Sequence, residues 1–319
     1  MNKVKLVIPG DDPPQITGSP HLDRLKPYGD IVLHTTKPPS SSAKMERVQE
    51  ADIIINCYGG TPWSKHELQQ LPNLKMISLS SVGTDMIDLE HAREMGIVVS
   101  NVRGETAPII AEHMFGLMLG AAKRCTIHTS QIKSGEWEPR DNIYLHGKTL
   151  GIIGTGNSGS VMAKLGNAIG MNVIAWTFHP SKDKEHKLNL KYVEFNELLS
   201  TSDVISLHLK LTKESRNILA SQQFALMKPG AILVNGARAG LIDTNALINA
   251  LKTNHLSGVA LDVYDREPIP PNHELLTFNQ VVLTPHIADQ TPEGREILNK
   301  CVVDNAIAFL NGTPENVVA

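Results

Sequence analysis

The amino-acid sequence predicts an α/β protein that contains a doubly wound parallel sheet and a second, smaller α/β domain. Three observations support this prediction. With 319 residues, the chain exceeds the usual size of a single hydrophobic core. Short β-branched runs alternate with amphipathic stretches, and strands separated by helices pair in parallel through right-handed crossovers. Residues 107–122 form an uninterrupted apolar stretch between two such series and are long enough for a connecting helix.

The two series of predicted strands define the domains. The first has strands at residues 5–8, 30–34, 52–56, 75–79 and 97–101, and the second at residues 149–153, 172–176, 203–209, 231–235, 258–263 and 280–283. A last helical pattern, residues 292–310, should cross back to the first series. We therefore expect a discontinuous first domain, residues 1–103 and 288–319, and a second domain at residues 104–287.

Composition and charge exclude several functional classes. The hydrophobic fraction of 41% and the charged fraction of 20% are typical of globular proteins. A net charge of −3 with scattered lysines offers no basic surface for nucleic acid. The apolar run at residues 4–9 is too short for a signal peptide or a membrane span, so we expect a cytoplasmic protein.

The cysteines indicate reduced thiols. Cys57, Cys125 and Cys301 are far apart and lack the paired spacing of a metal or redox site. Cys57 comes just before Tyr58-Gly59-Gly60, a loop that could face a cleft.

A glycine-rich turn follows the predicted strand at residues 149–153. Gly154, Gly156 and Gly159, with Asn157 and Ser158 between the last two, fit the pattern G-x-G-x-x-G. Such glycines allow a tight turn and close approach of the backbone to a pyrophosphate at a helix N-terminus. The pattern alone is weak, but a helical pattern at residues 160–169 and another strand follow it. This context predicts a Rossmann domain that binds NAD or NADP.

The residue after the second strand of this unit bears on the form of the cofactor. An acidic residue usually stands there and binds the ribose hydroxyls of NAD, but this chain has Thr177. Nothing at that position repels a 2′-phosphate. His179, Lys182 and Lys184 could pair with one, or could equally lie in a solvated loop, so the choice between NAD and NADP stays open.

Three chemically distinctive residues follow predicted strands. Arg238 comes after residues 231–235, Glu267 after residues 258–263, and His286 after residues 280–283. Ligands of open α/β sheets bind at the C-terminal ends of strands, so these residues can converge although they are distant in sequence. Taken one at a time, Arg238 could form a surface ion pair, Glu267 could be a turn residue, and His286 could be a histidine whose hydrogen bonds are satisfied at a strand end. Together, beside a dinucleotide turn, they are much harder to explain as coincidence.

The sequence resembles the D-isomer-specific 2-hydroxyacid dehydrogenase family. The resemblance rests on Gly147-Lys148-Thr149-Leu150-Gly151-Ile152-Ile153-Gly154, Met227-Lys228-Pro229-Gly230-Ala231, Leu261-Asp262-Val263 and Pro285-His286-Ile287. It runs from about residue 75 to about residue 305. It implies an oxidoreductase that transfers hydride between NAD(P)H and a small 2-oxo acid or D-2-hydroxy acid, such as glyoxylate or hydroxypyruvate.

The resemblance also implies that the discontinuous domain is a flavodoxin-like substrate-binding domain, and it implies roles for individual residues. His286 would be the general acid/base, and Glu267 would raise its pKa and keep it charged. Arg238 would bind the substrate carboxylate and polarise the adjacent carbonyl oxygen. A second carboxylate contact on the other domain, so that the substrate bridges the cleft, would come from the backbone amides of Ser81, Val82 and Gly83.

Cofactor contacts are implied in the same way. Asp262 resembles the residue that holds the nicotinamide carboxamide, with a strand-end hydrogen bond to backbone as the alternative. His208 and Leu209 resemble the segment beside the adenosine. The full expected cofactor-binding set is Gly154, Gly156, Asn157, Ser158, Gly159, Thr177, His208, Leu209, Ala237, Arg238, Asp262 and His286.

Some positions depart from the family pattern. Asn157-Ser158 stands where many relatives have Arg-Ile, which removes a cation near the pyrophosphate. Ala239 replaces the usual glycine and would be strained if that position needs a positive φ. Glu112-His113 does not predict a metal site, because adjacent helical residues do not share a face.

The same family supplies the alternatives. Some relatives are NAD(H)-responsive corepressors, but this chain lacks extra tails and keeps all three acid–base residues. Formate oxidation is disfavoured because those relatives have an amide in place of Glu267. A short phosphoglycerate dehydrogenase, acting on a phosphorylated acid, stays open. We expect a homodimer that pairs near residues 107–122 and binds a small-molecule substrate, but no nucleic acid, membrane or metal.

Overall fold

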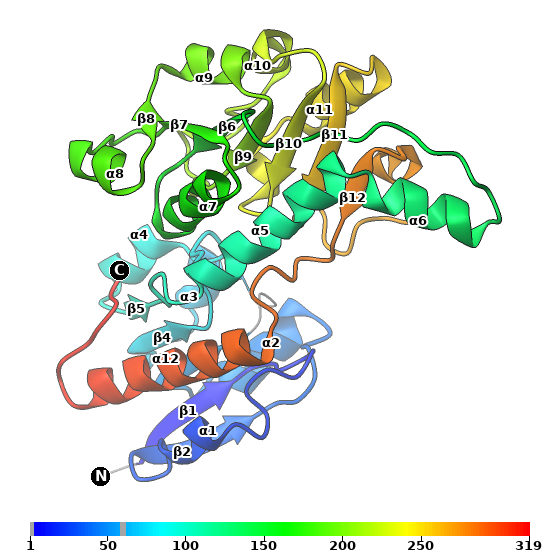
Figure 1. Cartoon of the computed structure of the whole chain (residues 1–319). Coiled ribbons are helices and arrows are strands. Elements are labelled where there is room, and N and C mark those ends of the chain that lie inside the picture. Colours follow the sequence, from blue (N-terminus) through cyan, green and yellow to red (C-terminus); the bar gives the residue numbers. More distant parts are fainter. Residues whose placement is uncertain (1–2, 58–61) are drawn as a thin grey trace. The chain divides into compact units, whose positions relative to one another are not determined.

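The computed structural model describes residues 3–57 and 62–319, so the predicted loop Tyr58-Gly59-Gly60 lies outside the described residues. The chain divides into two compact units, coloured by sequence in Figure 1. The first comprises Met1–Thr106 and Gln290–Ala319, and the second comprises Ala107–Asp289.

The first unit is built on a parallel sheet of five strands in its described residues. In chain order these are β1 (Val4–Ile8), β2 (Gly29–Leu33), β3 (Ile53–Asn56), β4 (Met76–Leu79) and β5 (Val98–Ser100). Their order across the sheet is β2-β1-β3-β4-β5, which is the flavodoxin-like order. This confirms the predicted α/β architecture of the smaller domain.

Helices cover both faces of this sheet. α1 (Pro20–Asp23) and α12 (Pro292–Leu310) pack on one face, while α2 (Ser41–Val48), α3 (Lys65–Leu68) and α4 (Leu89–Glu94) pack on the other. Neighbouring isoleucines of β3 point into the two opposite cores, and that strand is buried along its whole length.

The second unit has a parallel sheet of seven strands among its described residues. They are β6 (Thr149–Ile153), β7 (Asn172–Trp176), β8 (Lys191–Tyr192), β9 (Val204–Leu207), β10 (Ala231–Asn235), β11 (Leu256–Leu261) and β12 (Val281–Leu283). The order is β12-β11-β10-β9-β6-β7-β8, so the direction of winding reverses between β6 and β9. Open α/β sheets bind ligands at such a switch point. The doubly wound Rossmann prediction is confirmed.

The helices of the second unit also lie on both faces. α5 (Ala107–Ala122) and α7 (Asn157–Ala168) cover one face, as Figure 1 shows, and α9 (Phe195–Thr201), α10 (Ser221–Leu226) and α11 (Thr244–Lys252) cover the other. α6 (Cys125–Lys133) and α8 (Lys182–Lys187) lie outside these layers. In the part of the chain that the structure describes, no helix combines the length and apolarity needed to cross a membrane.

Candidate active site

The glycine-rich turn between β6 and α7 leaves no room for side chains at two positions. Gly154 has φ +99°, and a Cβ there would lie 2.8 Å from the carbonyl carbon of His208. A Cβ on Gly159 would lie 2.0 Å from the carbonyl oxygen of Gly154. Both glycines are therefore required by packing within the protein itself.

The third glycine faces open space instead. A Cβ on Gly156 would meet nothing within 4 Å. Gly156 is also the N-cap of α7, and no side chain caps the helix there. The first amides of α7, beginning at Asn157 and Ser158, thus lack the usual side-chain acceptor. An uncapped helix N-terminus behind an open glycine fits the pyrophosphate of a dinucleotide.

His208 supports this turn from the neighbouring strand. Its side chain is buried, with Nε2 2.9 Å from the Ser206 hydroxyl and Nδ1 3.2 Å from the Ser158 hydroxyl. Burial lowers the pKa of His208 to about 3, so the ring is neutral and adds no cation. Leu209 packs beside it, within 2.9 Å of where a Cβ on Gly154 would lie. Thr177 follows directly after β7 and is half-buried.

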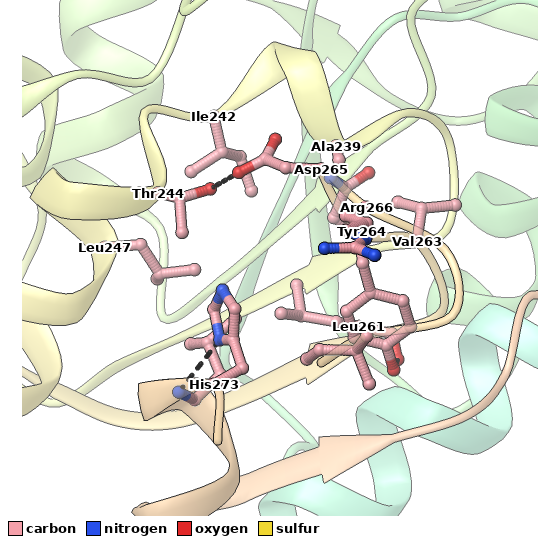
Figure 2. A pocket seen from close by; sticks show the side chains of 13 residues that line it. Ala239, Ile242, Thr244, Leu247, Leu261, Val263, Tyr264, Asp265, Arg266 and His273 are labelled. Atoms are coloured by element: carbon pink, nitrogen blue, oxygen red, sulfur yellow. Dashed lines mark hydrogen bonds between the residues drawn. The ribbon is translucent and has the colours of Figure 1, made fainter. Parts of the chain in front are cut away.

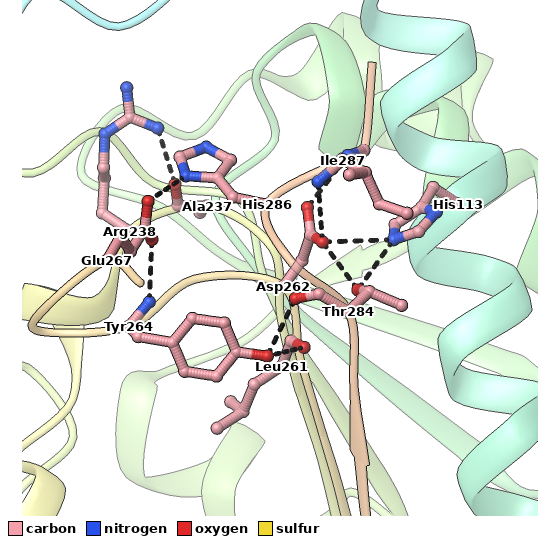
Figure 3. A network of polar contacts seen from close by, with 11 residues as sticks. His113, Ala237, Arg238, Leu261, Asp262, Tyr264, Glu267, Thr284, His286 and Ile287 are labelled. Carbon is pink, nitrogen blue, oxygen red and sulfur yellow. Dashed lines mark hydrogen bonds and ion pairs between the residues drawn. The ribbon is translucent and has the colours of Figure 1, made fainter. Parts of the chain in front are cut away.

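His286 and Glu267 form a direct pair. Nδ1 of His286 lies 2.7 Å from Oε2 of Glu267, and both side chains are partly exposed (Figure 3). The hydrogen bond and the negative charge of Glu267 raise the pKa of His286, against the opposing effects of burial and of the Arg238 charge. The pair therefore favours imidazolium and carboxylate together.

The loop after β11 holds Glu267 in place. Burial raises the pKa of Glu267, but hydrogen bonds from His286 and from the backbone N–H of Tyr264 outweigh it, and the net pKa is lowered. The Tyr264 amide donates to Oε1 at 3.0 Å, and the Tyr264 hydroxyl donates to the Thr284 carbonyl at 2.8 Å. One tyrosine thus ties the Glu267 loop to the strand end that precedes His286.

Arg238 is presented by a short loop after β10. The buried side chain of Asn235 accepts the amide of Ala237 at 3.0 Å and donates to the carbonyl of Arg238 at 2.9 Å. Figure 3 shows the Arg238 side chain beside Glu267 and the His286 ring. Ala239 begins a right-handed 3-10 helix, Ala239–Leu241, so the strain expected there for a positive φ does not arise.

Asp262, at the end of β11, holds the backbone around His286. The residue His286 has φ 55°, a left-handed conformation that costs a non-glycine residue about 1–2 kcal/mol. The fully buried carboxylate of Asp262 accepts the Ile287 amide and the Ala288 amide, each at 2.9 Å. It also accepts the Thr284 hydroxyl at 2.6 Å. These contacts fit the strand-end hydrogen bond that was the alternative to a carboxamide contact.

His113 completes this network and was not predicted to take part in the site. Its Nε2 lies 3.1 Å from the Thr284 hydroxyl and 3.5 Å from the Asp262 carboxylate (Figure 3). His113 stands on α5, four residues before the buried Leu117, and thus on the core side of an apolar helix. A polar residue within that apolar stripe was the available signal.

The predicted carboxylate contacts at Ser81, Val82 and Gly83 follow β4 in the first unit. The Ser81 hydroxyl donates to the Gly83 carbonyl at 2.8 Å, and the Ser81 carbonyl accepts the Val102 amide at 3.0 Å. The buried Asn101 donates to the Val82 carbonyl at 2.7 Å. The loop is therefore fixed by Asn101 and Val102, which follow β5 in the same unit.

A pocket in the second unit lies beside the loops that follow β10 and β11. Its lining includes Ala239, Thr244, Asp265 and His273 (Figure 2). The Thr244 hydroxyl donates to the Asp265 carboxylate, and the His273 ring accepts the Leu275 amide at 3.2 Å. Arg238, Glu267 and His286 do not line this pocket.

A family model matches more than half of the chain. Residues 115–288 match the model described as D-isomer specific 2-hydroxyacid dehydrogenase, NAD binding domain. This range contains the glycine turn as well as Arg238, Glu267 and His286.

Individual relatives agree over nearly the whole length. A glyoxylate reductase from Thermococcus litoralis is 38% identical over 292 residues, which are 88% of each chain. The structure of a D-lactate dehydrogenase from Aquifex aeolicus, complexed with NAD and lactic acid, is similar with a TM-score of 0.85 and 28% identity, covering 98% of both chains.

A second solved structure binds the other nicotinamide cofactor. An acyclic imino acid reductase in complex with NADPH and D-Arg has a TM-score of 0.89 and 27% identity, and 99% of this chain and 100% of that chain are covered. Sequence, fold and site geometry lead to one assignment. This chain belongs to the D-isomer-specific 2-hydroxyacid dehydrogenase family.

Proposed function

We propose that this chain is an NAD(P)H-dependent reductase that converts small 2-oxo acids to D-2-hydroxy acids. The observation that carries the proposal is the 2.7 Å pair between His286 and Glu267, next to Arg238 at the C-terminal strand edge. The glycine turn of the same unit supports a dinucleotide as the redox partner. No relative named above is a corepressor, and we do not propose that alternative.

His286 is the proton donor in this proposal. Its Nδ1 is engaged by Glu267, so Nε2 is the atom that gives a proton to the carbonyl oxygen as the oxygen becomes an alkoxide. NADH or NADPH, when bound, supplies the hydride to the carbonyl carbon. In the oxidising direction, neutral His286 takes the hydroxyl proton, and Glu267 stabilises the imidazolium that forms.

Arg238 is the residue that selects acids. Its planar guanidinium can bind a carboxylate through two parallel hydrogen bonds and polarise the neighbouring carbonyl oxygen. We also propose that the backbone amides of Ser81, Val82 and Gly83 contact the carboxylate, and that the first unit is the substrate-binding domain. The second unit, Ala107–Asp289, is then the cofactor-binding domain, for which the sequence predicts bounds at residues 104 and 287.

A steady-state panel tests this function. Glyoxylate, hydroxypyruvate, pyruvate and 3-phosphohydroxypyruvate are each mixed with enzyme and either NADH or NADPH, and the loss of absorbance at the reduced nicotinamide band is followed. Plain aldehydes and ketones without a carboxylate are the matched controls for Arg238. We expect turnover of at least one 2-oxo acid and far slower turnover of the controls. No turnover of any acid with either cofactor would refute the proposal.

We further propose that the enzyme is a cytoplasmic homodimer. Its three cysteines are free thiols, which suits a reducing compartment. Large apolar side chains are unusually exposed on α6 and on the segment after it. Ile132 is 59% exposed, Trp137 83% and Tyr144 71%, and such surfaces are typical of protein interfaces.

A further inference from the structure

The end of β7 carries no acid that would favour NAD. The chain runs from Trp176 into Thr177, Phe178 and His179, so no carboxylate stands where one usually binds the ribose hydroxyls. Thr177 can donate a hydrogen bond to a phosphate oxygen but cannot repel it. This strand end therefore tolerates a negative 2′-phosphate on the adenosine ribose.

Lys184 brings a cation to the glycine turn. It belongs to α8, in the crossover after β7, and its Nζ donates to the carbonyl oxygen of Thr155 at 2.7 Å. Thr155 stands between Gly154 and Gly156, is buried, and shares a hydrogen bond of 2.8 Å with the hydroxyl of Tyr192. The carbonyl that holds Lys184 is therefore itself fixed in the turn that approaches the cofactor.

The charges around Lys184 leave it available to an anion. Two acids flank it in sequence, but the carboxylate of Glu185 accepts the Tyr192 amide at 2.9 Å. Asp183 lies in the exposed first turn of α8. Among the described residues, the recorded partner of Lys184 is a carbonyl rather than a carboxylate. An ammonium group has three donors, so two remain after Thr155 is satisfied.

We propose that Lys184 binds the 2′-phosphate of NADPH and makes this enzyme prefer NADPH to NADH. The proposal rests on the proposed function, which supplies the dinucleotide. The 2′-phosphate carries close to two negative charges at neutral pH, whereas the ribose of NADH carries none, so a cation here discriminates between the two.

The first test compares cofactors in steady-state kinetics with one 2-oxo acid. We expect wild-type kcat/KM to be at least about tenfold higher with NADPH than with NADH. Lys184→Gln should lower the NADPH value by about 10- to 100-fold, the usual worth of a charge-assisted hydrogen bond, and change the NADH value less than about threefold. Lys187→Gln, an exposed lysine in the same helix, is the matched control and should leave both values unchanged.

The second test measures binding without turnover. By calorimetry, the wild-type protein should bind adenosine 2′,5′-bisphosphate about tenfold more tightly than adenosine 5′-monophosphate, and Lys184→Gln should abolish that difference. Lys184→Arg keeps the charge and should retain it. A thermal melt of each variant accompanies the titration, because a variant that had failed to fold would also show no binding. Thr177→Asp should lower affinity for the bisphosphate alone.

Several results would overturn the proposal. Equal wild-type binding of the two adenosine phosphates would refute it, and so would an equal loss of both in Lys184→Gln, since Lys184 would then serve a group common to NADH and NADPH. Turnover that favours NADH would refute the preference but leave the proposed reduction of 2-oxo acids intact. Absence of turnover with both cofactors would instead refute the proposed function.

Discussion

The buried carboxylate of Asp262 accepts the backbone amide of Ile287 at 2.9 Å, and through it holds the residue that follows His286. The same carboxylate holds the Thr284 hydroxyl on the other side. His286 therefore keeps a left-handed backbone because its neighbours are tied down. The position of His286, the proposed proton donor, depends on a residue that is itself wholly buried.

Asp262→Asn tests this positioning role. The substitution keeps the shape but replaces an acceptor oxygen with a donor that would face other donors. We expect the free energy of unfolding to fall by about 1–3 kcal/mol and kcat to fall by about tenfold or more, because His286 loses its place. Urea unfolding and steady-state kinetics measure the two effects, with the exposed Asp141→Asn as control. A wild-type kcat in Asp262→Asn would contradict the role.

Glu267→Gln should move the pH profile. In the proposed mechanism, reduction requires protonated His286, so kcat/KM for a 2-oxo acid should fall as pH rises through the His286 pKa. The hydrogen bond and charge of Glu267 raise that pKa, while burial and Arg238 lower it. Removing the charge therefore shifts the falling limb to lower pH, and a limb that stays in place would argue against the pairing.

The same pair links stability to pH. The pKa of His286 is higher in the folded protein than in the unfolded chain. The contribution of the pair to the free energy of unfolding is therefore fully present below the unfolded pKa and is lost as pH rises through the folded pKa. In Glu267→Gln, the fall in the free energy of unfolding over this pH range should be smaller. Denaturant midpoints of both proteins, followed upward from slightly acidic pH, measure the difference.

Two glycine substitutions separate folding from cofactor binding. In Gly156→Ala the new Cβ meets nothing within 4 Å inside the protein, so we expect the free energy of unfolding to change by no more than about 1 kcal/mol. Its methyl group enters the space left for the pyrophosphate, and cofactor affinity should fall at least about tenfold. Gly154→Ala, with φ +99° and a contact of 2.8 Å to His208, should instead destabilise the fold. Unchanged cofactor affinity in Gly156→Ala, by fluorescence titration, would refute this placement.

The exposed apolar side chains of α6 and of the segment after it bear on the proposed oligomeric state. Trp137→Glu places a charge on a side chain that is 83% exposed, and it should convert a dimer to a monomer in light scattering. Leu226→Glu, on α10 and 41% exposed, is the control and should stay dimeric. A wild-type protein that is monomeric at all concentrations would exclude the dimer.

Much of the fold follows from local patterns. The helices Ala107–Ala122 and Pro292–Leu310 have the bounds expected from their apolar runs and from prolines at their starts. α7 begins at Asn157, earlier than expected, because Gly156 itself is the N-cap. β8 was not predicted, since two residues at the sheet edge, Lys191 and Tyr192, show no periodicity.

The sequence predicts the chemically distinctive residues of the site, but not the residues that hold them in place. Strand ends located Arg238, Glu267 and His286 because such ends meet at one edge of a parallel sheet. The roles of Tyr264 and His113 depend on which elements pack together, and no local pattern encodes that. Likewise, only the return of α8 to the glycine turn distinguishes Lys184 from its neighbour Lys182.

His286→Asn is the most direct test of the proposed function, measured as steady-state reduction of a 2-oxo acid alongside fluorescence titration of NADH and NADPH. Asparagine removes the titratable proton but keeps a polar side chain. We predict that turnover falls by about two to four orders of magnitude, while cofactor affinity changes less than about threefold. Turnover close to that of the wild-type protein would contradict the assignment of His286 as the proton donor.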